Sequence, residues 1–210
     1  MNSTQRLLDG PAGRIEVLVD QPAAPRGLAL IAHPHPLGGG SNTNKVVHTL
    51  ARSFLALGYA CWRPNFRGVG LSEGVHDHGQ GECDDLLSVL DSARPEYAHL
   101  PLILAGYSFG AYCQTHVAHR LADAGQPAER LVLVGTAAGF VEGNRRYDTA
   151  AVPANTLVIH GAEDTTVPLA NVFAWAAPLD LPVVVIPGAD HFFHRRLHLI
   201  RDVVTRSWKL

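Results

Sequence analysis

The residues with the clearest chemical potential are a serine and two glycines in a Gly-x-Ser-x-Gly motif at 106–110. The apolar run 102–105 precedes this motif, and a helical pattern over 111–124 follows it. On a sharp turn from a strand into a helix, glycines avoid Cβ clashes and the serine hydroxyl projects above the edge of the sheet. We therefore expect Ser108 to be a nucleophile; the alternative is a serine that caps the helix with its side chain.

A serine hydroxyl is a weak nucleophile at neutral pH, so it needs a base, usually a histidine, that a carboxylate orients. Asp164 follows the predicted strand 156–160, and His191 follows the predicted strand 183–186. Loops at the C-terminal ends of parallel strands share one edge of a sheet. We expect Ser108, Asp164 and His191 to meet at that edge.

Other candidates for the base and the acid are present, because the chain contains twelve histidines. Position favours His191 over His194 and His198, which fall on the pattern of a C-terminal helix and are assigned to packing or to the surface. Asp190 is a competing carboxylate, but adjacent residues rarely direct their side chains toward each other in the required way. Glu163 is expected to be solvated.

The elements that must position these residues alternate between strands and helices along the chain. A turn cluster at 9–13 followed by polar and apolar alternation at 14–19 predicts an antiparallel N-terminal hairpin at a sheet edge. Apolar runs predict buried strands at 28–32, 59–62, 102–106, 131–134, 156–160 and 183–186. Helical spacing predicts helices at 44–57, 82–93, 111–124, 169–177 and 195–208.

This order predicts an α/β fold, a doubly wound and mostly parallel sheet in one domain spanning residues 1–210. Pro95 is expected just beyond the second helix. The segment 135–153 joins two strands and is too short for a separate cap domain, so an open, shallow site is expected.

The chain resembles the α/β-hydrolases, and more narrowly the small bacterial serine hydrolases of that superfamily that lack a lid. Besides the motif at 106–110, the resemblance rests on the loops 33–40, 65–74 and 188–193, and it spans nearly the whole chain. The order serine, aspartate, histidine is also the order of that fold. The resemblance implies an α/β-hydrolase fold without a cap domain and carboxylic-ester hydrolase activity.

The backbone amide of Phe109 follows the nucleophile at a helix N-terminus and is expected to donate to an oxyanion. A second donor is expected from the loop 33–40, whose two prolines have no N–H. The resemblance favours the backbone amide of His35, with Leu37 in reserve. The glycines at 38–40 are alternatively a flexible surface turn.

Histidines at several loops also suggest a zinc site, since imidazole is a common metal ligand. We assign no metal, because His33 and His35 belong to a different predicted loop from His76 and His78, and no His-Glu-x-x-His helix accompanies them. Arg67 and Glu82 are instead expected to tie neighbouring loops together, and so to be structural.

Bulk properties exclude several other classes. A net charge of −2 and a pI of about 6.6 provide no basic surface for nucleic acid. The N-terminus lacks the apolar core of a signal peptide and no apolar stretch is long enough to span a bilayer, so no membrane contact and a cytoplasmic location are expected. Cys61, Cys83 and Cys113 are too scattered for a disulfide framework and are expected to be reduced packing residues.

The expected reaction is hydrolysis of a small carboxylic ester through an acyl-enzyme, and it requires no cofactor. Thioesterase, peptidase, dienelactone-hydrolase-like or peroxide-using activities would use the same groups and remain alternatives. A non-catalytic binding protein on the same fold is the alternative from a different class.

Overall fold

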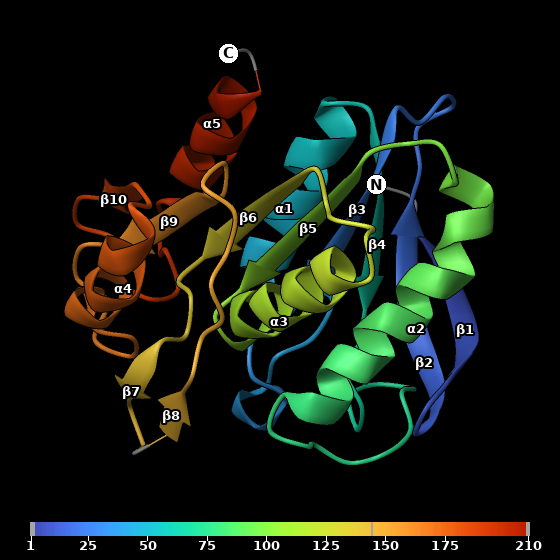
Figure 1. Ribbon diagram of the computed structural model, residues 1–210, viewed down its shortest axis with the longest axis horizontal. Helices are drawn as coiled ribbons and strands as arrows, with labels where there is room; N and C mark the ends of the chain where they lie inside the picture. Colours follow the sequence, from blue (N-terminus) through green and yellow to red (C-terminus); the bar gives the residue numbers. More distant parts are fainter. Residues whose placement is uncertain (1–2, 144, 209–210) are drawn as a thin grey trace.

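The computed structural model describes residues 3–143 and 145–208. Ten strands are formed by these residues: β1 (Thr4–Gly10), β2 (Gly13–Asp20), β3 (Gly27–Ala32), β4 (Tyr59–Pro64), β5 (Leu102–Tyr107), β6 (Arg130–Val134), β7 (Gly139–Val141), β8 (Arg145–Tyr147), β9 (Leu157–Gly161) and β10 (Val183–Ile186). Eight of them form one sheet in the order β1-β2-β4-β3-β5-β6-β9-β10 (Figure 1). From β4 to β10 every neighbouring pair is parallel, whereas β2 pairs antiparallel with both β1 and β4.

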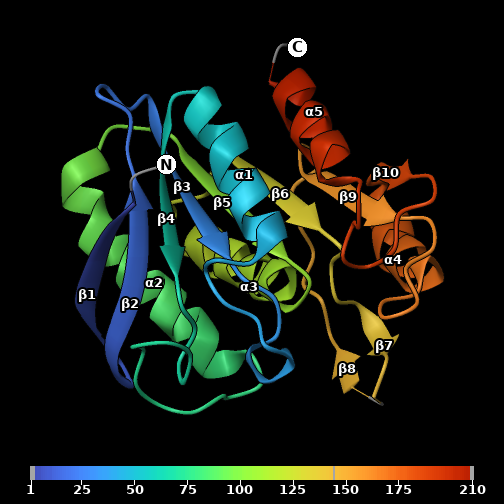
Figure 2. The ribbon, with the colours of Figure 1, turned by 180° about the vertical axis from the view of Figure 1, so that it is seen from behind.

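Helices cover both faces of this sheet. They are α1 (Lys45–Ala56), α2 (Gln80–Tyr97), α3 (Phe109–Asp123), α4 (Leu169–Ala176) and α5 (Leu197–Ser207), with short 3₁₀ turns at Pro36–Gly38 and Ala177–Leu179. Figure 1 shows α2, α3 and α4 in front of the sheet, and Figure 2 shows α1 and α5 on the opposite face. Two buried clusters match these two layers, because successive residues of a strand point to opposite faces. The predicted doubly wound α/β fold with its antiparallel edge hairpin is therefore confirmed.

The strand order reverses between β3 and β5, because β4 lies on one side of β3 and β5 on the other. Ligands of open α/β sheets bind outside the carboxyl ends of the strands at such a reversal. The loop after β3 begins at His33, and the turn after β5 holds Ser108. The topology thus brings these two segments to the same position at the sheet edge.

Helix α2 is longer than expected, and the prediction that Pro95 lies beyond it is wrong. The helix runs through Pro95 to Tyr97. A proline inside a helix leaves the carbonyl four residues earlier without its donor. Here that residue is Asp91, which is exposed, so water can replace the lost donor. Tyr97 is buried and donates from its hydroxyl to the Gln21 side chain, which holds the last turn against the sheet.

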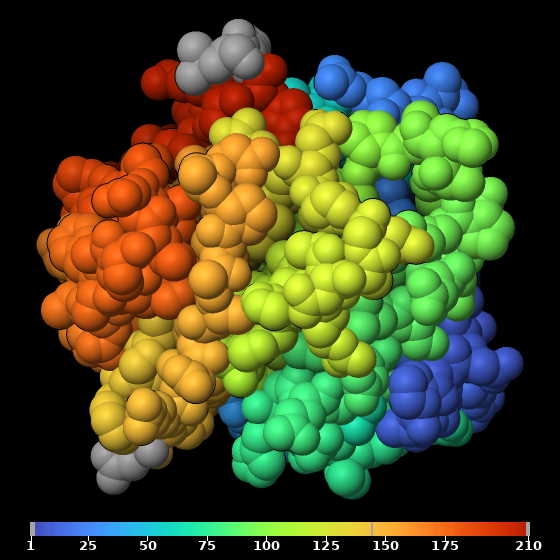
Figure 3. Space-filling model, viewed as in Figure 1, coloured from blue at the N-terminus to red at the C-terminus, as the bar shows by residue number. Residues whose placement is uncertain are grey.

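Two further differences concern the second half of the chain. The segment 135–153 contains no cap domain, as expected, but it is not a plain loop: β7 and β8 form an antiparallel hairpin within it. This hairpin protrudes at the lower edge of the space-filling view, in gold (Figure 3). Helix α5 begins at Leu197, so the prediction that His194 belongs to the C-terminal helix is wrong.

The three cysteines are buried and free, as predicted. Among the described residues, no helix combines the length and the apolar character needed to cross a bilayer.

Candidate active site

Ser108 sits at a strained turn between β5 and α3. Its backbone has φ 56° and ψ −118°, a region that non-glycine residues rarely adopt. The two glycines of the motif are required by close contacts: a Cβ on Gly106 would lie 2.5 Å from Gly110, and one on Gly110 would lie 2.4 Å from the carbonyl oxygens of Ala32 and His33. The Ser108 side chain makes no capping hydrogen bond to α3, so the helix-capping alternative is wrong.

The hydroxyl of Ser108 instead faces His191. The distance from Ser108 Oγ to His191 Nε2 is 3.0 Å, and the distance from His191 Nδ1 to Asp164 Oδ2 is 2.7 Å. With Nδ1–H donating to the carboxylate, Nε2 is left to accept the serine proton. The three side chains expected from the sequence are thus brought together from the ends of β5, β9 and β10, and all three residues are buried.

The Asp164 carboxylate is fixed by the turn that follows β9. Its Oδ1 accepts the N–H of Val167 at 2.7 Å, which leaves Oδ2 for His191. A neighbour that the sequence interpretation missed is His160, whose Nε2 is 2.9 Å from the carbonyl oxygen of Val167 and 3.3 Å from Asp164 Oδ2. Burial lowers the pKa of His160, so its ring is a neutral N–H donor beside the carboxylate. Only its position at the end of an apolar strand could have drawn attention to it.

Tyr107, which the sequence interpretation also missed, holds the backbone of His191. Its hydroxyl donates to the backbone carbonyl of His191 at 2.9 Å, and the two ring centroids are 5.3 Å apart. Burial raises the pKa of Tyr107 far above its ordinary value, so this hydroxyl stays protonated and keeps donating.

The competing carboxylates are engaged elsewhere or exposed. Asp190 accepts both the backbone N–H of His194 and a ring N–H of that histidine, and it does not contact His191 through its side chain. Glu163 is exposed, as expected.

The loop after β3 is ordered by its first two histidines. His33 bridges two loops: its Nδ1–H donates to the carbonyl of Pro34 at 2.6 Å, and its Nε2 accepts the N–H of Phe66 at 2.9 Å. Burial lowers the pKa of His33 to about 4, which keeps the neutral form that this arrangement requires. The neutral histidine therefore fixes the position at which residue 35 enters the site.

His35 caps the 3₁₀ turn Pro36–Gly38, so the glycines at 38–40 belong to a defined turn. The N–H of Leu37 donates to His35 Nδ1 at 3.2 Å, and the N–H groups of Gly38 and Gly40 both donate to the carbonyl of His35 at 3.1 Å. The amide of Leu37 is thus engaged within its own loop, which makes it a poor reserve donor.

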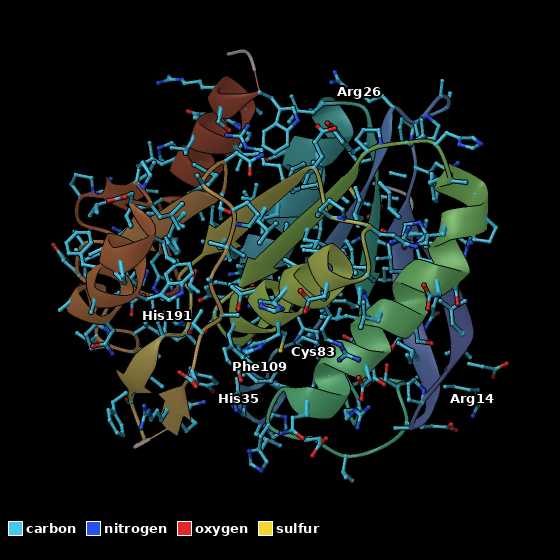
Figure 4. All side chains as sticks on the ribbon, viewed as in Figure 1. Arg14, Arg26, His35, Cys83, Phe109 and His191 are labelled. Atoms are coloured by element: carbon cyan, nitrogen blue, oxygen red, sulfur yellow. The ribbon has the colours of Figure 1, made fainter. Side chains whose placement is uncertain are left out.

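Phe109 opens α3, so its N–H is among those that have no partner in a preceding helical turn. The rings of His35 and Phe109 are 5.0 Å apart, and Figure 4 shows the two residues side by side at the lower rim of the sheet. The two backbone amides expected to donate hydrogen bonds to the oxyanion therefore belong to residues whose side chains lie next to each other.

A cleft of about 220 Å³ lies over Ser108 and His191. The loop after β3 forms one wall, and the β7–β8 hairpin forms another with Val141, Arg145 and Tyr147. The hairpin residues were missed because two strands of three residues give too little alternation to be recognised. The small volume admits a small substrate group.

The other histidines belong to two different loops, as predicted, after β3 and after β4. The two loops are in contact, because the ring centroids of His35 and His76 are 4.7 Å apart; those of His76 and His78 are 5.0 Å apart. Among the residues that the structure describes, no group of three or more possible ligands is arranged to hold a metal ion.

Arg67 and Glu82 tie loops together, as predicted. Arg67 makes two hydrogen bonds of 2.8 Å to the Asp85 carboxylate and another to the carbonyl of Gly81. The buried Glu82 carboxylate accepts Nδ1–H of His76 and the backbone N–H groups of Asp77 and Gly79.

Comparisons with known proteins agree with this fold. A family model described as serine aminopeptidase, S33, matches residues 23–153. The structure of an α/β serine hydrolase homologue from Coxiella burnetii is 38% identical, covers 98% of this chain and 97% of its own, and has a TM-score of 0.86. An α/β serine hydrolase without a lid from Xanthomonas campestris is 36% identical, with coverages of 99% and 94% and a TM-score of 0.87. An uncharacterized protein of Rickettsia prowazekii (strain Madrid E) is 32% identical over an alignment of 202 positions, which covers 90% of this chain and 82% of its own.

Proposed function

The chain belongs to the serine aminopeptidase S33 family of the α/β-hydrolase superfamily, and from this premise we propose that it hydrolyses small carboxylic esters through an acyl-enzyme on Ser108. The observation that carries the proposal is the pair of hydrogen bonds that joins Ser108 to His191 at 3.0 Å and His191 to Asp164 at 2.7 Å. A serine held this way has a base for its proton and a carboxylate that stabilises the resulting imidazolium.

In the first step, Ser108 Oγ attacks the ester carbonyl carbon and its proton moves to His191 Nε2. The tetrahedral oxyanion accepts hydrogen bonds from the backbone amides of Phe109 and His35. His191 then gives its proton to the departing alkoxide, so the C–O bond of the ester breaks and an acyl-serine remains. Water attacks the acyl-serine with the same proton transfers, which releases the acid and restores Ser108.

The test is the rate of hydrolysis of p-nitrophenyl acetate and butyrate by the purified protein and by Ser108→Ala. We expect Ser108→Ala to lose at least about a thousandfold in kcat, because the nucleophile is absent. Ser88→Ala, in α2, removes a serine that bonds only the carbonyl of Asp9 and should retain the wild-type rate. Equal rates for Ser108→Ala and the wild type would reject the proposal.

Matched substrates separate the remaining alternatives. A thioester of the same acyl group and an amino-acid p-nitroanilide test thioesterase and aminopeptidase activity with the same variants. The ester is expected to have the highest kcat/KM, since the 220 Å³ cleft suits a short acyl group. A non-catalytic binding protein would hydrolyse none of the three in a Ser108-dependent way.

A further inference from the structure

A second cleft opens beside the cleft that contains Ser108, and histidine and arginine side chains form most of its lining. Its volume is about 160 Å³, and its walls are formed by His35, His76, His78, Phe109, Arg145, Arg146 and Tyr147. His35, Arg145 and Tyr147 also line the first cleft, so the two clefts adjoin. The shared border includes His35, which lies beside Phe109 at the lower rim in Figure 4.

Among the described residues, no carboxylate lines the second cleft. The acid closest to it in the hydrogen-bond network is Glu82, which is fully buried and already accepts three N–H groups, including Nδ1–H of His76. Glu142 lines only the first cleft, where its carboxylate accepts the hydroxyl of Thr166. Positive charge in the second cleft is therefore not neutralised from within its walls.

Arg145 is the cation at the border between the two clefts. Its guanidinium donates to the backbone carbonyl of Glu142 through Nε and one terminal nitrogen, both at 3.2 Å. It pairs with no carboxylate of the described residues, so no acidic side chain offsets its positive charge and some of its N–H donors remain available. Arg146, from the same strand, lies 5.6 Å from the ring of Phe140 and likewise has no acidic partner among the described residues.

The histidine at the border of the two clefts, His35, adds a neutral N–H donor and no further charge. Burial, together with the nearby His76 and Arg145, lowers the pKa of His35 to about 4, so its ring is neutral at physiological pH. Because His35 Nδ1 accepts the N–H of Leu37, its proton resides on Nε2. A neutral donor and two guanidinium groups form an environment that favours an anion.

The position of the second cleft indicates which part of a substrate would enter it. His191 must protonate the leaving alcohol, so the alcohol lies on the side of His191 and Phe192, which line the first cleft but not the second. The second cleft begins instead at His35, the predicted oxyanion donor. An acyl chain that extends from Ser108 past His35 would meet Arg145.

We propose that the preferred substrates are esters whose acyl chain ends in a carboxylate, that is, monoesters of short dicarboxylic acids, with Arg145 binding this carboxylate in the second cleft. The inference rests on the proposed esterase function and adds the substrate class to it. The negative charge selects against neutral esters of equal length because only the carboxylate forms a charge-assisted hydrogen bond with the guanidinium.

The test compares monoethyl succinate, glutarate and adipate with the ethyl esters of the corresponding monoamides, which have the same size and no charge. For at least one chain length, kcat/KM of the carboxylate ester should exceed that of its amide by about tenfold or more, and high salt should reduce the ratio. Arg145→Gln should bring the ratio close to one. Arg206→Gln, on the exposed side of α5, removes an arginine far from both clefts and should keep the wild-type ratio.

Two results would overturn the inference: a wild-type ratio of one or less at all three lengths, or an unchanged ratio in Arg145→Gln. If no ester is hydrolysed at all, the proposed function fails, and calorimetric binding of monoethyl glutarate and of the uncharged ethyl ester of its monoamide to Ser108→Ala decides about the site. Tighter binding of monoethyl glutarate that is lost on adding Arg145→Gln would establish the anion site without the reaction. Equal binding of the two esters would reject the site.

Discussion

At the level of single residues, the site depends on side chains that hold one another through hydrogen bonds. Asp164 shows this most clearly, because one carboxylate oxygen accepts Val167 N–H and the other faces His191. Ser108 and His191 gain no such support from their own strands, and the loops must place them. The motif chemistry was therefore readable from sequence, whereas the supporting contacts of Tyr107 and His160 arise only from tertiary packing.

Replacing Asp164 tests whether its charge and orientation matter. In Asp164→Asn, the amide oxygen can still accept Val167 N–H, but the amide nitrogen then faces His191 Nδ1 and favours the wrong tautomer. We expect kcat for p-nitrophenyl butyrate to fall by about a thousandfold or more. Glu163→Gln, the exposed neighbour, should retain full activity. Similar losses in both variants, or none in either, would contradict the role of Asp164.

The buried His33 predicts a pH dependence of stability. Its pKa is about 4 in the folded protein and about 6.5 in the unfolded chain, so the unfolded chain binds the extra proton first as the pH falls. The contribution of this residue to stability is complete above about pH 6.5 and is lost as the pH falls toward about 4. The loss amounts to roughly 2 to 3 kcal/mol.

Urea unfolding between about pH 7.5 and 4.5 measures this contribution. In His33→Gln the decrease in the free energy of unfolding over this range should be smaller than in the wild type by that amount. His198→Gln, exposed on α5, is the matched control and should decrease as the wild type does. The same decrease in His33→Gln and in the wild type would show that His33 is not the neutral bridge described.

At the scale of elements, the long apolar strands and their order were predictable, because burial on both faces leaves a continuous signal in the sequence. The β7–β8 hairpin was not, since three-residue strands carry no period. Pro95 predicted a helix end that the packing of Tyr97 overrides. The rings of His35 and His76 come from two loops that are far apart in the sequence, and no local pattern encodes their contact.

The hairpin should determine which acyl chains fit. Tyr147 is buried, contacts the rings of Phe109 and Tyr112, and narrows the cleft. In the wild type, kcat/KM for p-nitrophenyl esters should fall from butyrate to octanoate. Tyr147→Ala should lower the ratio of kcat/KM for butyrate to kcat/KM for octanoate by about tenfold, because the removed side chain leaves room for the longer acyl chain. Phe140→Ala removes an exposed aromatic from the same hairpin and should not change the preference. A wild-type preference for octanoate would contradict the narrow cleft.

At the scale of the whole molecule, one buried ion pair joins the antiparallel edge to the parallel sheet. Arg63 on β4 bonds Asp20 at the end of β2 at 2.6 Å and the carbonyl of Asn42, and both charged side chains are almost fully buried. Composition and net charge correctly suggested a large core. They gave no indication of this pair, because pairing across strands is a property of the register.

Removing one partner of that pair should destabilise the entire fold. Asp20→Asn leaves the buried Arg63 charge without its carboxylate, and we expect the free energy of unfolding to fall by about 3 kcal/mol. Glu96→Gln breaks the exposed pair with Arg6 and should change it by no more than about 0.5 kcal/mol. Urea denaturation measures the free energy of unfolding of both variants. Equal decreases in the two variants would mean that the buried pair contributes no more to stability than the exposed pair.

The central claim is that His191 activates Ser108 for attack on an acyl group. Its most direct test is mass spectrometry of the protein after treatment with a fluorophosphonate, with peptide mapping of the adduct. We expect one adduct, on Ser108, which is absent in Ser108→Ala and forms far more slowly in His191→Ala. An unmodified protein under conditions that label a control serine hydrolase, or an adduct on another serine, would contradict it.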